Sequence, residues 1–115
     1  MDYKVIFTKN QLKSILNILD QLKTKTTFVN IKKIVYYKKE AELHITNNDD
    51  SIIIFDLTKD ISTQVEKLNI FYKKYQNDIK AWIYYVDLRI NEKLIYCKNE
   101  TKKSCEENYT SIYGK

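Results

Sequence analysis

The sequence predicts one α+β domain, with a mainly antiparallel sheet and two helices packed against it in the order α-β-β-β-α-β-β. Three observations support this prediction. The chain has 115 residues, a size typical of a single domain. Apolar residues recur with helical spacing in two segments, and elsewhere they alternate as in strands. We assign residues 1–98 to the domain and residues 99–115 to a polar tail.

Each of the two expected helices carries one apolar stripe. The first spans residues 8–23 and the second spans residues 58–76, with Thr58 or Asp60 as its N-cap. The stripe residues are Leu12, Ile15, Leu16, Leu19 and Leu22 in the first helix, and Ile61, Val65, Leu68, Tyr72 and Tyr75 in the second. Both helices should therefore pack against the sheet through these stripes.

The segment between the helices predicts three strands, at residues 28–38, 41–46 and 51–56, because β-branched and aromatic residues replace the helix formers. Short turns join them, so we expect an antiparallel meander. The third strand is apolar on both faces, which predicts a central position. His44 alternates with the inward-facing residues of its strand, which predicts a histidine on the surface.

The last third of the chain predicts a hairpin. Residues 81–90 alternate cleanly and indicate a long strand whose second face is polar. Asn91 and Glu92 allow a tight turn into a final strand at residues 93–98. The tail at 99–115 is polar and weakly patterned, so we expect most of it to be flexible.

The composition excludes several chemistries. One glycine and no proline leave no glycine-rich loop to cradle a phosphate. One histidine, two cysteines and scattered carboxylates form no spacing typical of a catalytic or metal site, so we expect no enzyme and no cofactor. The net charge of +5 comes from lysines mixed with acidic residues, which permits nucleic-acid binding without indicating it.

Three stretches, taken in order, resemble one protein family. Residues 53–57 read Ile-Ile-Phe-Asp-Leu, residues 60–68 end in a Lys-Leu pair, and residues 85–90 read Tyr-Val-Asp-Leu-Arg-Ile. Over residues 12–98 this order is similar to the C-terminal β domain of the bacterial cell-division proteins FtsQ and DivIB. The resemblance implies a non-enzymatic divisome scaffold domain at the extracytoplasmic face of the membrane, within a longer single-pass protein. The tail has no counterpart in that family.

The last strand supplies the candidate binding site, because no later element is expected to pair with its free side. An unpaired edge accepts a partner strand through backbone hydrogen bonds. The resemblance implies that the partner is a small coiled-coil division protein of the FtsB or DivIC type, alone or with FtsL; we expect no nucleic acid. The candidate partner-binding residues are Arg89, Ile90, Lys93, Leu94, Ile95, Tyr96 and Lys98.

Arg89, the only arginine, has two interpretations. Its planar guanidinium can hold a partner carboxylate through two hydrogen bonds, as the resemblance implies. It can equally pair within the chain, with Asp87, Glu92 or another nearby acid.

Cys97 and Cys105 are close enough in the chain for a bridge to form. We expect a disulfide if the domain is exported, as the resemblance implies, and free thiols in a reducing cytoplasm.

Two other functions stay open at this stage. The chain fits a stand-alone cytoplasmic interaction or immunity protein. It also fits, less well, a basic nucleic-acid-binding module in which tyrosines such as Tyr36 and Tyr37 stack on bases while neighbouring lysines meet phosphates.

Overall fold

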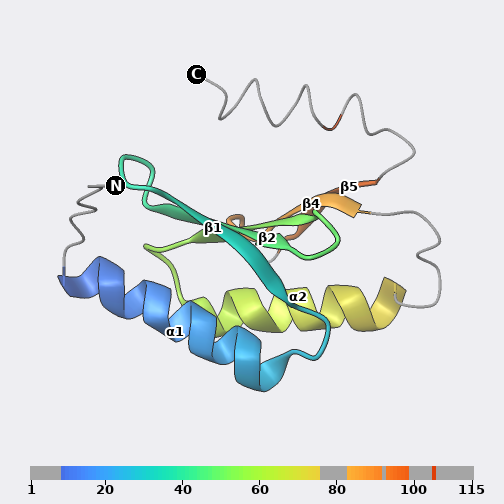
Figure 1. Cartoon of the computed structure of the whole chain (residues 1–115), viewed down its shortest axis with the longest axis horizontal. Coiled ribbons are helices and arrows are strands. Elements are labelled where there is room, and N and C mark those ends of the chain that lie inside the picture. Colours follow the sequence, from blue (N-terminus) through green and yellow to red (C-terminus); the bar gives the residue numbers. More distant parts are fainter. Residues whose placement is uncertain (1–8, 76–82, 92, 99–104, 106–115) are drawn as a thin grey trace.

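The computed structural model describes residues 9–75, 83–91, 93–98 and Cys105. It has two layers, a five-stranded sheet and two helices that cover one face of it (Figure 1). The elements follow in the order α1 (Lys9–Lys25), β1 (Ile31–Tyr37), β2 (Glu42–Asn47), β3 (Ile52–Asp56), α2 (Ile61–Tyr75), β4 (Ile83–Asp87) and β5 (Ile95–Lys98). The predicted α+β class and element order are confirmed.

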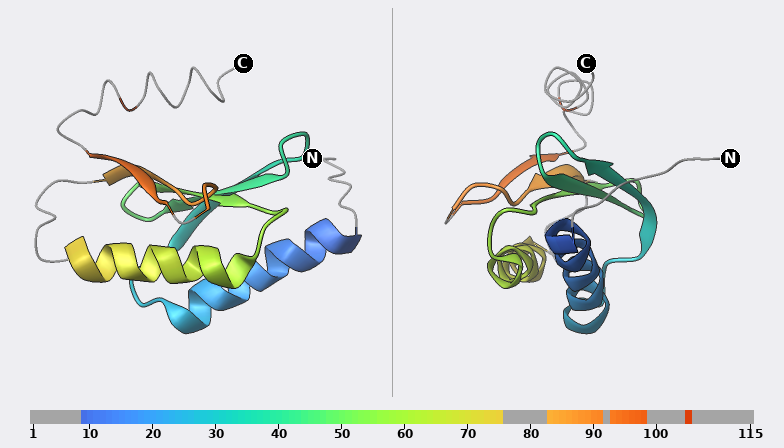
Figure 2. Two further views of the ribbon diagram at one scale, coloured as in Figure 1. Left: turned by 180° about the vertical axis from the view of Figure 1, so that it is seen from behind. Right: turned by 90° about the vertical axis from the view of Figure 1, so that its left-hand side faces the viewer.

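The sheet is mixed, so the prediction of a mainly antiparallel sheet is wrong. The strands lie in the order β1-β2-β3-β4-β5, and β3 pairs with β4 in parallel while the other three pairs are antiparallel. The reason is α2, which returns the chain along the sheet between β3 and β4, so that both strands run in the same direction. The edges, β1 and β5, lie on opposite sides of the molecule (Figure 2).

The apolar core lies between the sheet and the helices. Alternate residues of the three central strands face the helices, where the aliphatic side chains of α1 and α2 pack on them. In the right-hand view of Figure 2, α1 lies under the half of the sheet nearer β1, and α2 lies under the half nearer β5. The fully buried strand residues of this core are Leu43, Ile45, Ile53, Phe55 and Val86.

The predicted stripe of α1 is only partly correct. Ile15 and Leu22 are buried as expected, but Leu12 and Leu16 are exposed and Ile18 takes their place in the core. The helix carries two neighbouring apolar lines, and the packing of α1 against α2 and the sheet buries one of them. The other line, with Leu12 and Leu16, remains exposed.

The beginning of α2 is fixed by polar contacts. Asp60 is the N-cap: its Oδ2 accepts a hydrogen bond from the backbone N–H of Thr63 at 3.0 Å and another from the Thr63 hydroxyl. These bonds lower the pKa of Asp60. The side-chain amide of Gln64 pairs with the backbone of Asp56, accepting from its N–H and donating to its carbonyl at 2.8 Å each. The first turn of α2 is thereby attached to the end of β3.

Candidate functional site

β5 occupies the edge that the sequence analysis assigned to a partner. Among the strands that the structure describes, it has a neighbour, β4, on one side only. Leu94 and Tyr96 turn inward against the core, and the Tyr96 ring lies 4.9 Å from that of Phe71. Ile95 faces the other way and is 44% exposed. The strand therefore anchors one face in the core and leaves the other accessible.

The remaining predicted partner-binding residues lie around this strand. Ile90 and Lys93 are exposed in the connection between β4 and β5, while Arg89 is half-buried at the start of that connection. Lys98 ends β5, and its side chain lies outside the described part of the chain. All these residues belong to one edge, but they differ in how much side chain they present.

A lysine from α2 holds the connection that leads into β5. The ammonium of Lys67 donates to the carbonyl oxygens of Leu88 at 2.8 Å, Ile90 at 2.7 Å and Lys93 at 3.0 Å. Burial lowers the pKa of Lys67, the nearby Lys59 ammonium lowers it further, and the Asp87 carboxylate acts in the opposite direction. These three bonds fix where β5 begins.

Sequence analysis did not identify this lysine as part of the site. The family resemblance included Lys67 only as half of a Lys-Leu pair in the helix. A signal was present, because Lys67 lies next to the core residue Leu68 and is therefore near the boundary between helix and sheet. The carbonyl groups that it meets come together only in three dimensions.

Arg89 pairs within the chain. Its Nε and Nη2 donate to the two carboxylate oxygens of Asp87 at 2.8 and 2.6 Å, and its Nη1 donates to Oε2 of Glu42 at 2.6 Å. The arginine thus links the end of β4 to β2, across the intervening strand β3. Burial acts to raise the pKa of Asp87, but the hydrogen bonds and charge of Arg89 outweigh it, and the pKa is lowered.

His44 is not a surface histidine, so that prediction is wrong. It lies on the face of the sheet away from the helices, as its alternation implies, but it is only 1% exposed. Its ring lies 4.4 Å from that of Tyr37, and its Nε2 is 3.2 Å from Oε1 of Glu42. Alternation assigns a residue to a face, but it does not reveal whether that face is covered.

The four side chains form one buried ionic cluster, which we define as Glu42, His44, Asp87 and Arg89. Burial lowers the pKa of His44, although Glu42 acts against this, and Nε2 of His44 lies in hydrogen-bonding distance of Glu42. Hydrogen bonds link the four side chains, and this arrangement suits the cluster to holding strands together.

A disulfide joins Cys97 of β5 to Cys105, with the Cα atoms 5.8 Å apart. Cys105 is fully buried, so this part of the tail is attached to the last strand. The other residues of the tail, for which we expected flexibility, lie outside the described residues. β5 is consequently fixed before its start by Lys67 and near its end by the disulfide.

The fold and the site together define a mixed α+β domain with an accessible strand edge beside a buried ionic cluster. Comparison with family models, with curated proteins and with solved structures finds no match to the chain. In the described part of the chain, neither helix is long and apolar enough to cross a membrane. Nor do His, Cys, Asp and Glu side chains there gather into a group of three that could hold a metal ion.

Proposed function

We propose that the chain is a non-enzymatic scaffold domain of the bacterial divisome, of the FtsQ and DivIB type. It binds a small coiled-coil division protein of the FtsB or DivIC type, alone or with FtsL, by accepting a strand at β5. The observation that carries this proposal is a short strand at the sheet edge, held before its start by Lys67 and near its end by the disulfide.

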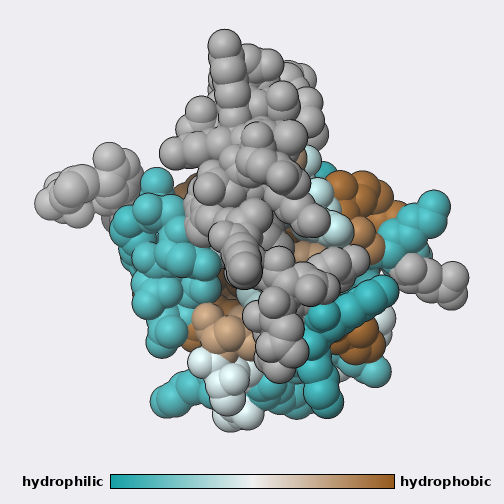
Figure 3. All heavy atoms as spheres, turned by 90° about the vertical axis from the view of Figure 1, so that its right-hand side faces the viewer, coloured by the Kyte–Doolittle hydropathy of each residue, from teal (hydrophilic) through white to brown (hydrophobic). Residues whose placement is uncertain are grey.

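The fixed position of β5 favours strand addition. A partner strand forms backbone hydrogen bonds along the edge. Because the edge strand is already ordered, binding costs less conformational entropy and more of the free energy of these bonds contributes to affinity. Exposed Ile90 and Ile95 add apolar contacts that select a particular partner sequence. Seen from the right-hand side of Figure 1, the described surface shows separate apolar patches between hydrophilic residues (Figure 3). Recognition at this end therefore depends on a few apolar side chains together with the backbone edge.

Arg89 takes a positioning role in this proposal. Its guanidinium already binds Asp87 and Glu42, and its side chain retains 25% exposure. A partner carboxylate would have to compete with these two internal carboxylates. We therefore assign the direct charge contact with the partner to Lys93, which is exposed beside the edge. Arg89 contributes by fixing the end of β4, from which the connection to β5 departs.

The proposal includes a location. The domain works at the extracytoplasmic face of the membrane, as part of a longer single-pass protein. The disulfide between Cys97 and Cys105 supports this placement, because disulfides persist in oxidising compartments and are rare in the cytoplasm.

The test is binding of the extracytoplasmic part of the FtsB- or DivIC-type protein from the same organism, measured by calorimetry with the full chain. Ile95→Glu places a charge on the accessible face of β5 and should weaken binding about tenfold or more. Ile70→Glu is the matched control, because Ile70 is 60% exposed on α2, away from the edge. Wild-type affinity in a folded Ile95→Glu variant would exclude strand addition at β5.

A further inference from the structure

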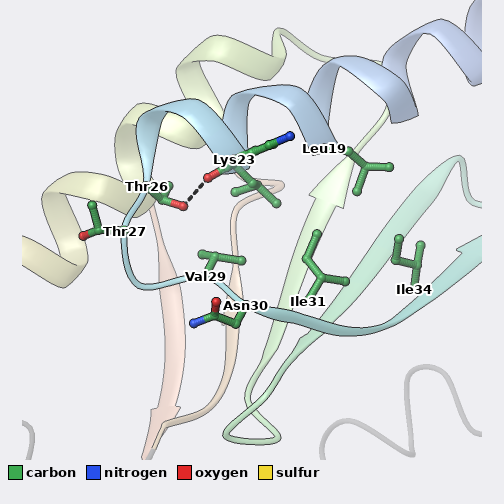
Figure 4. A pocket seen from close by; sticks show the side chains of 9 residues that line it. Leu19, Lys23, Thr26, Thr27, Val29, Asn30, Ile31 and Ile34 are labelled. Carbon is green, nitrogen blue, oxygen red and sulfur yellow. Dashed lines mark hydrogen bonds between the residues drawn. The ribbon is translucent and has the colours of Figure 1, made fainter.

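A second apolar site lies at the opposite edge of the sheet, between the C-terminal half of α1 and β1 (Figure 4). It is a pocket of about 570 Å³. Lys23 is the only charged residue among those that line it, and its apolar lining residues are Leu19, Leu22, Val29, Ile31 and Ile34. A concave apolar pocket beside a sheet edge is where an extended segment can place a side chain.

A β-bulge shapes the floor of this pocket. The register of β1 against β2 shifts between Ile31 and Lys33, so one extra residue, Lys32, is accommodated there. Ile31 and Ile34 consequently face the helix layer together, although three positions separate them, and each is 42% exposed. Figure 4 shows both side chains rising from β1 towards α1. The bulge thus puts both Ile31 and Ile34 in the pocket. In a regular strand, two residues three positions apart would point to opposite faces, and only one of them would reach the pocket.

The apolar surface continues along α1. Leu12 and Leu16 are exposed, and helical spacing places them on the same side of the helix as Leu19, which lines the pocket. The exposed apolar surface is therefore elongated, and we name it the α1/β1 groove after its concave part, the pocket. It consists of the pocket together with Leu12 and Leu16.

The charges around the α1/β1 groove are mostly positive. Lys23 lines the pocket, and Lys33 is exposed on β1, where its pairing with Thr46 puts it on the face of the sheet away from the helices. Asp20 is the only acidic residue in α1, and β1 has none. A ligand that carries carboxylates beside apolar side chains matches this pattern.

We infer that the α1/β1 groove binds an extended acidic segment of a partner protein, which adds to β1 as a strand. Its apolar side chains enter the pocket, and its Asp or Glu side chains, which alternate onto the other face of the sheet, meet Lys33. β1 is the other edge of the described sheet, so its outer backbone groups are placed to pair with such a strand. A second copy of this chain fits poorly, because two β1 strands would bring their lysines together.

The experiment uses the full chain and two synthetic peptides with identical alternating valines. One peptide carries glutamates between the valines, and the other carries lysines. The glutamate peptide should shift the amide resonances of β1 and of the C-terminal half of α1. It should bind about tenfold more tightly than the lysine peptide, and added salt should reduce this difference.

Matched variants locate the contact. Ile34→Glu, in the pocket, and Lys33→Glu, on the face that the glutamates reach, should each weaken binding of the glutamate peptide about tenfold. Ile70→Glu and Lys39→Glu are the controls, since both residues are exposed away from the pocket, and they should bind the peptide as the wild type does.

Two glutamate peptides with N-methyl groups on alternate residues test the strand geometry. The peptide whose N-methyl groups replace the N–H donors facing β1 should not bind. The peptide whose N-methyl groups face away from β1 should bind as the unmodified peptide does. If both N-methylated peptides bind equally, the segment does not add as a strand.

Several other results would overturn the inference. Equal affinity for the two charged peptides would remove the role of the lysines, and absence of binding would remove the site. A dimer in sedimentation experiments that Ile34→Glu dissociates would identify a second copy as the occupant. Binding to vesicles of anionic lipid, lost in the same variants and without peptide binding, would identify a membrane surface.

Discussion

The central strands β2, β3 and β4 carry buried residues on both faces of the sheet, but different interactions hold the two faces. On the helix-covered face, strand residues such as Leu43 and Ile53 pack against aliphatic side chains. On the other face, the ionic cluster holds two carboxylates, an imidazole and a guanidinium in hydrogen-bonding distance. An apolar face loses stability in proportion to the volume removed. An ionic cluster loses the most stability when one charged partner is removed and the others remain charged and buried.

The largest expected effect comes from Arg89→Met, which leaves Glu42 and Asp87 buried without their cation. We expect a loss of about 3–5 kcal/mol in the free energy of unfolding, measured by urea denaturation. Ile53→Val, on the helix-covered face, should cost only about 0.5–1.5 kcal/mol. A variant that combines Arg89→Met with Glu42→Gln and Asp87→Asn should recover part of the loss. Equal costs for the two single variants would show that the faces do not differ in this way.

The disulfide ranks next, and it belongs to the side of the sheet with the ionic cluster. Replacing both Cys97 and Cys105 by serine removes the restraint on the unfolded chain. For so short a loop this should lower the free energy of unfolding by about 2–3 kcal/mol. The comparison is urea denaturation of the wild type with and without a reductant. The reductant should lower the free energy of unfolding of the wild type by the same amount and leave that of the double variant unchanged. If the reductant also destabilises the double variant, the loss in the wild type cannot be assigned to this bond.

Lys67→Met tests a polar contact on the helix side, where solvent is closer. The variant loses three hydrogen bonds from the ammonium, but water can reach some of the carbonyl groups that it leaves. We expect a cost of about 1–3 kcal/mol and faster hydrogen exchange at the amides of β5. Lys59→Met is the control, because Lys59 donates to a single carbonyl in this connection, that of Arg89. If hydrogen exchange at β5 is unchanged in the Lys67→Met variant, the three hydrogen bonds of Lys67 do not fix the edge strand.

The smallest effect is a pH dependence due to His44. Its pKa is lower in the folded protein than the ordinary 6.5, so the unfolded chain binds the proton first as the pH falls. The contribution of His44 to stability is therefore complete above pH 6.5 and decreases below it, by at most about 1.4 kcal/mol per pH unit. His44→Gln should remove this slope, since the chain has one histidine. If the slope persists in that variant, another group is responsible.

Local patterns predicted much of the fold and less of the site. Alternation in the fourth strand correctly separated Val86 and Leu88, which enter the core, from Asp87 and Arg89 on the other face. The parallel pairing of β3 with β4 was missed, although a helix between two strands is typical of it. Periodicity identifies an apolar line on a helix, but it did not show that α1 buries Ile18 and exposes Leu16.

The site depends on contacts between distant parts of the chain. Glu42 and Arg89 are far apart in the sequence, and only the sheet order brings them into contact. The burial of His44 follows from the same arrangement, as does the contact of Lys67 with three carbonyl groups. No local sequence pattern identifies the partners in these contacts. The β5 edge was predictable because it needed only the position of the last strand.

The parallel pairing of β3 with β4 has a consequence for the order in which the domain assembles. The first three strands are joined by short turns, so they close with little loss of chain entropy and can form early. The β4–β5 hairpin can pair with β3 only after α2 has formed along the sheet. The pairing then covers only three residue positions. Because this pairing is so short, we expect the β4–β5 hairpin to detach from β3 by local unfolding before the rest of the domain unfolds. A partner bound to β5 would stabilise the pairing of β3 with β4. Hydrogen exchange in β4 would then be slower, although the partner does not contact that strand.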